Sequence, residues 1–217
     1  MLLQEASQKL LKLYSAVLCD SLDKLGFRQQ GMSPAIRPLD PGMRMVGTAR
    51  TLLSVRKPGM PDKPYHKELE ALDSLKPGDV IVFATGDDLS AGVWGELLST
   101  AAKAKGACGA VIDGLTRDAV AICKMGFPVY ARGLSPYDSY GRSEVIAYDV
   151  PIECGGVSVQ SGDIVFADYD GIVVIPDQAL TSVMESAEVK ASRERIVDEE
   201  FRKGRKVAEV FAEHGVL

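Results

Sequence analysis

The sequence has few of the residues on which several classes of protein depend. It contains two histidines, His66 and His214, and four cysteines that form no Cys-x-x-Cys pair. Structural zinc sites need several such ligands at close spacing, so we do not expect one. Residues 86–92 lack the G-x-G-x-x-G pattern, so a nicotinamide dinucleotide site is not supported either.

Long apolar runs and an excess of positive charge are also missing. No run approaches the roughly 18 consecutive apolar residues of a membrane-spanning helix. Gln4 and Glu5 follow the first three residues directly, which does not fit a secretory signal. The net charge of -5 argues against a broad phosphate-binding surface. We therefore expect a cytoplasmic protein with free thiols, and neither nucleic acid nor a membrane as its partner.

What the sequence does contain fits a single globular domain. Of its 217 residues, 46% are hydrophobic and 25% are charged, which is within the usual range for a folded protein. We divide residues 1–217 into N-terminal helices (1–28), a core (29–176) and a C-terminal helical tail (177–217). The predicted fold class is α/β, with a β/β/α layered core like that of swivelling domains.

Apolar residues recur at helical spacing near the start of the chain. They run from residue 7 to residue 25, and Gly26 follows as a typical helix stop. A second helix start at Tyr14-Ser15 or at Cys19-Asp20-Ser21 would divide this segment, and the sequence leaves both alternatives open. The pattern therefore predicts one or two amphipathic helices.

Strand and helix signals alternate through the core, which predicts βαβ units. The expected strands are 46–55, 80–84, 109–112 and 128–131, and the expected helices are 65–75, a helix starting near 95, and 119–124. Shorter strands follow in a region that we expect to be antiparallel, at 146–152, 156–159, 163–167 and 171–175. Asp177 or Thr181 is expected to cap a final helical stretch that reaches about residue 212, with an interruption at Gly204.

The residues with the clearest chemical potential lie in the segment from Ala84 to Asp118. Two strands in this segment end in polar loops, and the second loop is Asp113-Gly-Leu-Thr-Arg-Asp118. The helix start near Gly95 offers unpaired N–H groups to an anion. Arg117 can bind a carboxylate through two hydrogen bonds, and Asp118 with Glu96 can hold a hard divalent cation. This combination suits an anionic 2-oxo acid.

Four segments of the sequence resemble a known family. They are Gly95-Glu-Leu-Leu98, the 113–118 loop, the Val46-Gly-Thr-Ala-Arg-Thr51 strand and the late segment 162–176. The family is that of the class II pyruvate aldolases typified by 4-hydroxy-4-methyl-2-oxoglutarate aldolase, which also contains the regulator of ribonuclease activity A (RraA). Its strongest motif is an acidic residue followed at a fixed distance by Arg-Asp. Residues 97–116 give the matching gap here, but Glu96 replaces the usual aspartate.

The resemblance implies a role for each residue of this motif. Asp118 would be the direct ligand to Mg²⁺ or Mn²⁺, with water as most of the remaining ligands. Arg117 would bind the carboxylate and keto oxygen of the substrate, and the backbone amides of Gly95, Glu96, Leu97 and Leu98 would bind the pyruvyl carboxylate. The catalytic residues would be Arg117, Glu96 and Asp118, with Glu96 holding a water that relays the proton.

The implied activity is cleavage of a C–C bond in a small 4-hydroxy-2-oxo acid, which releases pyruvate. Oxaloacetate decarboxylation would be a second activity, because the same enolate forms when CO₂ leaves. The resemblance also implies a homo-oligomer, a trimer or a hexamer. Glu194, Glu199 or Glu200 of a neighbouring tail could complete the site, and the sequence does not choose among them.

Two other functions remain open at this stage. The family's other branch implies a protein that regulates a ribonuclease by surface contact, and a different metal-enolate enzyme is a third possibility. Several polar residues have simpler structural explanations. Asp87 and Asp88 are expected to form a turn, Asp113 to orient its loop, Asp168 and Asp170 to shape a hairpin, Trp94 to anchor packing, and both histidines to lie at the surface.

Overall fold

The computed structural model describes residues 2–216 and confirms the predicted α/β fold class. Its helices are α1 (Leu2–Leu10), α2 (Ser15–Lys24), α3 (His66–Asp73), α4 (Glu96–Ala104), α5 (Ala119–Met125), α6 (Leu180–Arg202) and α7 (Val207–His214), with a short 3₁₀ helix at Asp177–Ala179. Its strands are β1 (Arg37–Pro38), β2 (Met45–Arg56), β3 (Asp79–Ala84), β4 (Gly92–Trp94), β5 (Gly109–Thr116), β6 (Val129–Leu134), β7 (Ser143–Tyr148), β8 (Ile152–Cys154), β9 (Val157–Val159), β10 (Ile164–Ala167) and β11 (Ile172–Ile175).

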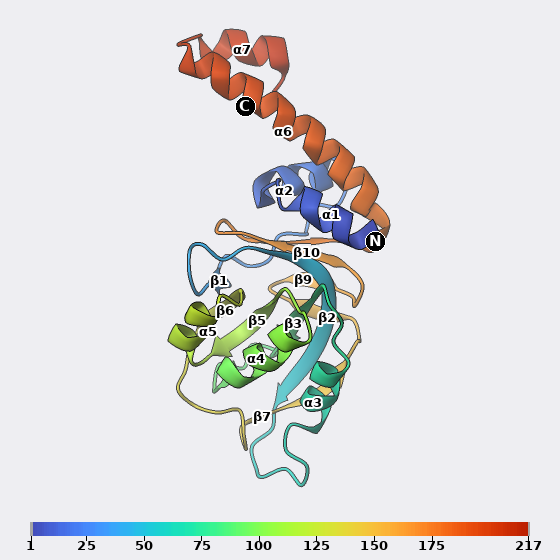
Figure 1. The fold of residues 1–217 in the computed structure, drawn as a ribbon, viewed down its shortest axis with the longest axis vertical. Helices are drawn as coiled ribbons and strands as arrows, with labels where there is room; N and C mark the ends of the chain where they lie inside the picture. Colours follow the sequence, from blue (N-terminus) through green and yellow to red (C-terminus); the bar gives the residue numbers. More distant parts are fainter. Residues whose placement is uncertain (1, 217) are drawn as a thin grey trace.

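Most strands belong to one large mixed sheet, in the order β1-β6-β5-β3-β2-β10-β11, with β4 beside β5 and β7 beside β2. Strands β2, β3, β5 and β6 are parallel. β10, β11 and β7 add to the sheet in antiparallel register, as expected for this part of the chain. Helices α3, α4 and α5 cover one face of the sheet (Figure 1). The small β8-β9 sheet contacts β2 and β3 and supplies the second β layer.

The strands at the centre of the sheet form the main core, because they are apolar on both faces. Every residue of β3 is buried, and so are the residues of β10 and β11. A second apolar cluster joins the β10-β11 hairpin to α1, α2 and the first half of α6. The two clusters hold the α3–α5 side of the sheet and the terminal helices in one continuous structure.

The N-terminal helices meet at Tyr14, one of the two break points that the sequence left open. Tyr14 has an extended backbone and precedes α2. The backbone N–H and the hydroxyl group of Ser15 both donate to the Asp168 carboxylate, at 2.9 and 2.7 Å. Asp168 also accepts the Asp170 N–H at 3.1 Å, so it shapes its own hairpin as predicted and holds α2 on it as well.

Three details of the predicted secondary structure are wrong. The strand expected at 146–152 is divided into β7 and β8, because Asp149 has a left-handed backbone (φ 54°) and binds Arg50 through both carboxylate oxygens. Strand β4 lies where the sequence indicated only a loop. Neither Asp177 nor Thr181 caps α6, which follows the 3₁₀ helix through Ala179 without a side-chain cap.

The C-terminal helices extend away from the sheet. α6 rises beyond α1 and α2, and α7 folds back along its far end (Figure 1). The predicted interruption at Gly204 is confirmed, since this residue lies between the two helices with φ 80°. Within the described residues, no helix combines the length and apolar character needed to cross a bilayer.

Candidate active site

The candidate site lies where parallel strands β3, β5 and β6 end. Ligands commonly bind in α/β sheets outside the carboxyl ends of such strands. β4 pairs with the end of β5, and the main chain then turns at Gly95 into α4. Strand β5 ends at Thr116, so Arg117 and Asp118 follow it directly and Asp118 begins α5. The sheet thus brings the two polar segments of the Ala84–Asp118 stretch together.

A cavity of about 270 Å³ opens between these segments and α3. Its walls come from α3, β4, the first turn of α4, the end of β5 and the loop that precedes β7. The residues that line it are Tyr65, Glu68, Leu69, Gly92, Val93, Trp94, Gly95, Leu97, Leu98, Arg117, Asp118, Asp138 and Ser139. Its volume suits a small molecule rather than a polymer.

Arg117 is the cation of this cavity and lies between two carboxylates. Its Nε is 3.6 Å from Asp118 Oδ2, and its Nη1 is 3.7 Å from Asp138 Oδ2. Both distances exceed those of a hydrogen bond, so the guanidinium N–H groups stay available to a ligand. The Arg117 backbone N–H donates to the Trp94 carbonyl at 2.8 Å, which fixes the residue beside β4.

Gly95 allows the two polar segments to approach each other closely. A Cβ atom at this position would lie 2.7 Å from Asp118 Oδ2 and 3.1 Å from Arg117 Cγ. Any other residue would therefore push the Arg117-Asp118 pair away. The next residue, Glu96, donates its backbone N–H to Asp118 Oδ2 at 3.2 Å. Its side chain is exposed and does not line the cavity.

Asp118 is held in an unfavourable backbone conformation. Its φ of 57° lies in the left-handed region, where a non-glycine residue is strained by about 1–3 kcal/mol. The surrounding contacts with Gly95, Glu96 and Arg117 maintain this conformation. Such strain is typical of functional positions.

The residues around Asp118 fit a hard cation better than zinc. Among residues 2–216, no three His, Cys, Asp or Glu side chains gather at metal-binding distances. A site with one carboxylate suits Mg²⁺ or Mn²⁺, because Mg²⁺ keeps several waters and binds through one or two carboxylates. Asp118 has the required chemistry, since its side chain is 42% exposed and lines the cavity.

Three titratable residues of the cavity were not predicted from the sequence: Tyr65, Glu68 and Asp138. The Tyr65 hydroxyl donates to Asp138 Oδ2 at 3.0 Å. Burial and this hydrogen bond raise the pKa of Tyr65 to about 12. Burial also acts to raise the pKa of Asp138, but the hydrogen bonds from Tyr65 and Tyr140 and the charge of Arg117 outweigh it and lower that pKa.

The missed residues carried only weak signals in the sequence. Asp138 lies in the polar and aromatic segment 135–141, which pairs with β4 through Gly92. Tyr65 precedes α3 with a left-handed φ of 59°, and nothing in the local sequence predicts that conformation. Glu68 follows His66 and Lys67 in an ordinary helical pattern, yet it is only 4% exposed.

The residues with simpler explanations behave largely as expected. Trp94 is buried, and its indole N–H donates to Ser99 Oγ at 2.8 Å. Asp87 has a left-handed turn conformation, and Asp113 accepts the Gly155 N–H at 2.7 Å. The side chain of His66 is 52% exposed. That of His214 is 22% exposed and lies beside Glu213.

Comparison with known proteins identifies the family of this α/β protein. The chain belongs to the RraA-like family, described as Aldolase/RraA, whose sequence model matches residues 15–174. Protein DlpA of Legionella pneumophila is 31% identical over 192 residues, which cover 87% of this chain but only 30% of DlpA. A Halalkalibacterium halodurans protein named "Putative 4-hydroxy-4-methyl-2-oxoglutarate aldolase" is 31% identical over 186 residues, 84% of this chain and 83% of that protein.

The solved structures support the same assignment of fold. The crystal structure of Streptomyces coelicolor RraAS2 is titled as an unusual member of the RNase ES inhibitor RraA protein family. It superimposes with a TM-score of 0.77 at 34% identity, and the match covers 93% of this chain and 96% of that one. The family therefore contains proteins named both as aldolases and as ribonuclease inhibitors.

Proposed function

We propose that this protein is a divalent-metal-dependent lyase that cleaves a 4-hydroxy-2-oxo acid and releases pyruvate, and that it also decarboxylates oxaloacetate. The observation that carries the proposal is the Arg117-Asp118 pair, which lines a cavity of about 270 Å³ beside the start of α4. The aldolase name of the Halalkalibacterium halodurans relative supports the same class of reaction.

Substrate binding would use the two groups of N–H donors at the site. The first turn of α4 leaves backbone N–H groups without helical partners, and Leu97 and Leu98 lie in this turn and line the cavity. They would bind the carboxylate of the 2-oxo acid, aided by the helix dipole. The Arg117 guanidinium would then reach the keto oxygen and the same carboxylate.

Cleavage of the C3–C4 bond leaves its electron pair on the pyruvyl fragment as an enolate. Arg117 would stabilise the negative charge that develops on the C2 oxygen, because its donors are already held at the cavity wall. Asp118 would hold the divalent cation, which supplies Lewis-acid stabilisation of the same charge when bound. Glu96, at the exposed start of α4, would order the water that takes the proton of the 4-hydroxyl group.

Replacing Asp118 with alanine tests this proposal directly. We expect Asp118→Ala to abolish pyruvate release from oxaloacetate and from a panel of 4-hydroxy-2-oxo acids in the presence of Mg²⁺ or Mn²⁺. A matched control is Asp73→Ala, which removes an 85% exposed carboxylate that pairs with Lys105 on the surface. A chelator should likewise abolish pyruvate release by the wild-type protein. Unchanged turnover of Asp118→Ala would remove the lyase assignment.

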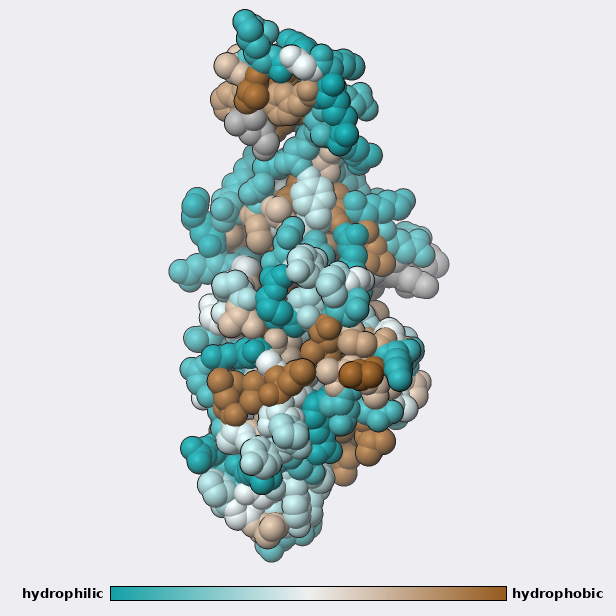
Figure 2. Space-filling model, turned by 90° about the vertical axis from the view of Figure 1, so that its left-hand side faces the viewer, coloured by the Kyte–Doolittle hydropathy of each residue, from teal (hydrophilic) through white to brown (hydrophobic). Residues whose placement is uncertain are grey.

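We also propose that the protein is a homo-oligomer, a trimer or a hexamer. Figure 2 shows an apolar band across the face on which α5 lies. Exposed apolar residues occur in α4 (Leu97, 78%), in α5 (Val120, 70%) and at the end of β6 (Leu134, 62%). A neighbouring copy would cover them.

Three acidic residues of the tail, Glu194, Glu199 and Glu200, lie on α6. α6 is at the opposite end of the molecule from α3, so these residues could serve only a neighbour's site (Figure 1).

A second candidate function is regulation of a ribonuclease by protein contact. The likeness to RraAS2, which is described as an unusual member of the RNase ES inhibitor RraA protein family, favours it. Contact between surfaces would not need the strained Asp118. Inhibition of an RNase E-type enzyme that survives Asp118→Ala would therefore support regulation, whereas pyruvate release that is lost in the same variant would support the lyase.

A further inference from the structure

Glu68 is a buried acid that has no role in the chemistry described above. It projects from α3 and is 4% exposed. Among the side chains that the structure describes, none donates a hydrogen bond to its carboxyl group. A buried carboxylate without a partner is costly, so the group remains protonated instead. Burial, and then repulsion from Asp138, raise the pKa of Glu68 to about 8.

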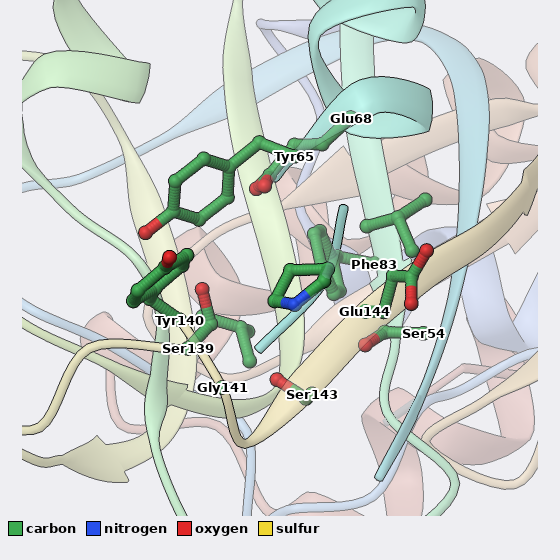
Figure 3. A pocket seen from close by; sticks show the side chains of 12 residues that line it. Ser54, Tyr65, Glu68, Phe83, Ser139, Tyr140, Gly141, Ser143 and Glu144 are labelled. Carbon is green, nitrogen blue, oxygen red and sulfur yellow. The ribbon is translucent and has the colours of Figure 1, made fainter. Parts of the chain in front are cut away.

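This acid lies between two cavities. It lines the substrate cavity together with Arg117 and Asp118. It also lines a second cavity of about 20 Å³, which is large enough for one water molecule. Figure 3 shows this smaller cavity, with Glu68 and Tyr65 projecting from the α3 side and Ser139, Tyr140 and Ser143 around it.

The small cavity has polar groups that could bind such a water. Ser143 Oγ is buried and has no hydrogen-bond partner among the described residues. Ser139, which lines both cavities, has its hydroxyl 3.4 Å from Asp138 Oδ1. A water at this position would connect the Glu68 carboxyl group with the exterior past Gly141 and Tyr140. Glu68 could therefore regain a proton without opening the substrate cavity.

The proposed reaction needs a proton donor that the residues assigned so far do not provide. After the C3–C4 bond breaks, or after CO₂ leaves, the enolate must accept a proton at C3 to become pyruvate. The water ordered by Glu96 acts at the 4-hydroxyl group, and an arginine guanidinium does not serve as a proton donor in proteins. Tyr65 holds its proton in the hydrogen bond to Asp138.

Resting on the proposed function, we propose that Glu68 is the proton donor that converts the enolate to pyruvate. The Glu68 O–H bond breaks as the C3–H bond forms, and the enolate electron pair becomes the new C–H bond. The resulting Glu68 carboxylate takes a proton from the water in the small cavity, and that water takes a proton from the solvent in turn. No oxidant or further reactant is required.

The charged and titratable groups around Glu68 set the pH range in which it can act. They come from the start of α3, the end of β5, the loop before β7 and β7 itself, and they are Tyr65, Arg117, Asp118, Asp138 and Glu144. Burial, and then repulsion from Asp138, keep the Glu68 proton in place at neutral pH. We therefore expect turnover to fall as the pH rises through about 8, where Glu68 loses its proton.

The test uses Glu68→Gln, which resembles the protonated acid in shape but has no acidic proton. Pyruvate is incubated in D₂O with the metal-loaded protein, and exchange of its methyl protons is followed by NMR, because exchange requires the enolate to form and to be protonated. We expect Glu68→Gln to lower the exchange rate and kcat by about 10²-fold or more, with KM changed by less than about 3-fold. The alkaline fall in kcat should also disappear.

Two further variants make the result specific. Glu70→Gln removes a carboxyl group of the same helix that lines neither cavity and pairs with Lys67 at the surface, and we expect wild-type exchange from it. Glu68→Asp keeps the acid but shortens it, so we expect a smaller loss and a retained alkaline fall. If Glu68→Gln does not fold, the pH profile of Glu68→Asp provides the test. Exchange by Glu68→Asp at the wild-type rate, with no fall in kcat at alkaline pH, would then overturn the proposal.

The outcomes separate this proposal from the proposed function. Exchange by Glu68→Gln within about 3-fold of the wild-type rate, with the alkaline fall intact, would overturn the role of Glu68 and leave the lyase standing. Wild-type protein that neither exchanges pyruvate protons nor releases pyruvate from any acid of the panel would overturn both.

Discussion

Charged side chains have different surroundings at the two ends of the molecule. Around the cavity, Glu68, Asp118 and Asp138 share the lining with a single arginine. Burial raises the pKa of Glu68, whereas hydrogen bonds and the charge of Arg117 lower the pKa of Asp138 against the effect of burial. In the C-terminal helices, the charges lie in water and pair with each other. Arg202 binds Asp198 at 2.7 Å and Lys203 binds Glu200 at 2.8 Å, both at helical spacing. The arrangement at the cavity is typical of groups that take part in chemistry, whereas that of the C-terminal helices is typical of a solvated surface.

Backbone strain follows the same division. Four non-glycine residues have positive φ within the described chain, and two of them, Tyr65 and Asp118, line the cavity. From α6 to the residue that follows α7, only glycines adopt this conformation, at Gly204 and Gly215. A strained residue persists only where its surroundings hold it in place. At the cavity, the fold therefore holds side chains in fixed positions at the cost of a less favourable backbone conformation.

Of the changes that compare the two ends of the molecule, Arg117→Lys is expected to have the largest effect, which is on catalysis. Lysine keeps the charge but cannot offer two parallel N–H donors, so the enolate oxygen and the carboxylate lose a shared partner. We expect pyruvate release to fall by about 10²–10³-fold, which corresponds to about 2.7–4 kcal/mol. Steady-state assays with oxaloacetate measure the loss. Arg202→Lys, in the exposed pair with Asp198, should keep full activity. Equal losses in the two variants would contradict the division described above.

The sequence predicted most of the fold because its strongest signals are local. The apolar run at Val80–Ala84 and the stops at Gly26 and Gly204 lie close to the observed boundaries. Arg117 and Asp118 were also visible, through their spacing from Glu96, although β5 continues to Thr116 where the sequence indicated a loop from Asp113. The sequence could not indicate Tyr65, Glu68 and Asp138, because their importance arises from burial and from contacts between α3 and the segment before β7. Those contacts join residues that are far apart in the chain.

A smaller effect is expected from a core change at the helical end. Val183 on α6 is fully buried against the cluster that joins α6 to the β10-β11 hairpin. Val183→Ala removes apolar contacts and leaves a cavity, so we expect unfolding free energy to fall by about 2–3 kcal/mol. Urea denaturation measures this change. Activity per folded molecule should stay at the wild-type level, because the cavity residues do not contact α6.

The matched control for this change lies on the same helix. Val189 is 55% exposed, so Val189→Ala should change the stability by less than about 0.5 kcal/mol. A large loss from Val189→Ala would indicate instead that a neighbouring copy covers this face of α6. A change in oligomeric state, measured by light scattering, would accompany it.

The smallest expected effect is a difference in pH dependence between two glutamates. The pKa of Glu68 rises from 4.5 to about 8 on folding, chiefly through burial, so the folded state binds the extra proton between these values. Its contribution to stability is present below pH 4.5 and is lost as the pH rises toward 8, with a slope of at most about 1.4 kcal/mol per pH unit. The stability gained by Glu68→Gln over wild type should therefore increase across this range.

Glu200 provides the opposite case in the same measurement. Hydrogen bonds from Lys203 and Arg205 lower its pKa from 4.5 to about 2, so its contribution is present above pH 4.5 and is lost only as the pH falls toward 2. Between pH 5 and 8 the stability difference between wild type and Glu200→Gln should therefore be constant, and salt should reduce it because the Lys203 partner is exposed to solvent. Urea unfolding of both variants at several pH values compares the two ends directly. A constant difference for Glu68→Gln would mean that Glu68 reaches solvent, and that the cavity end holds its acids no more tightly than the tail does.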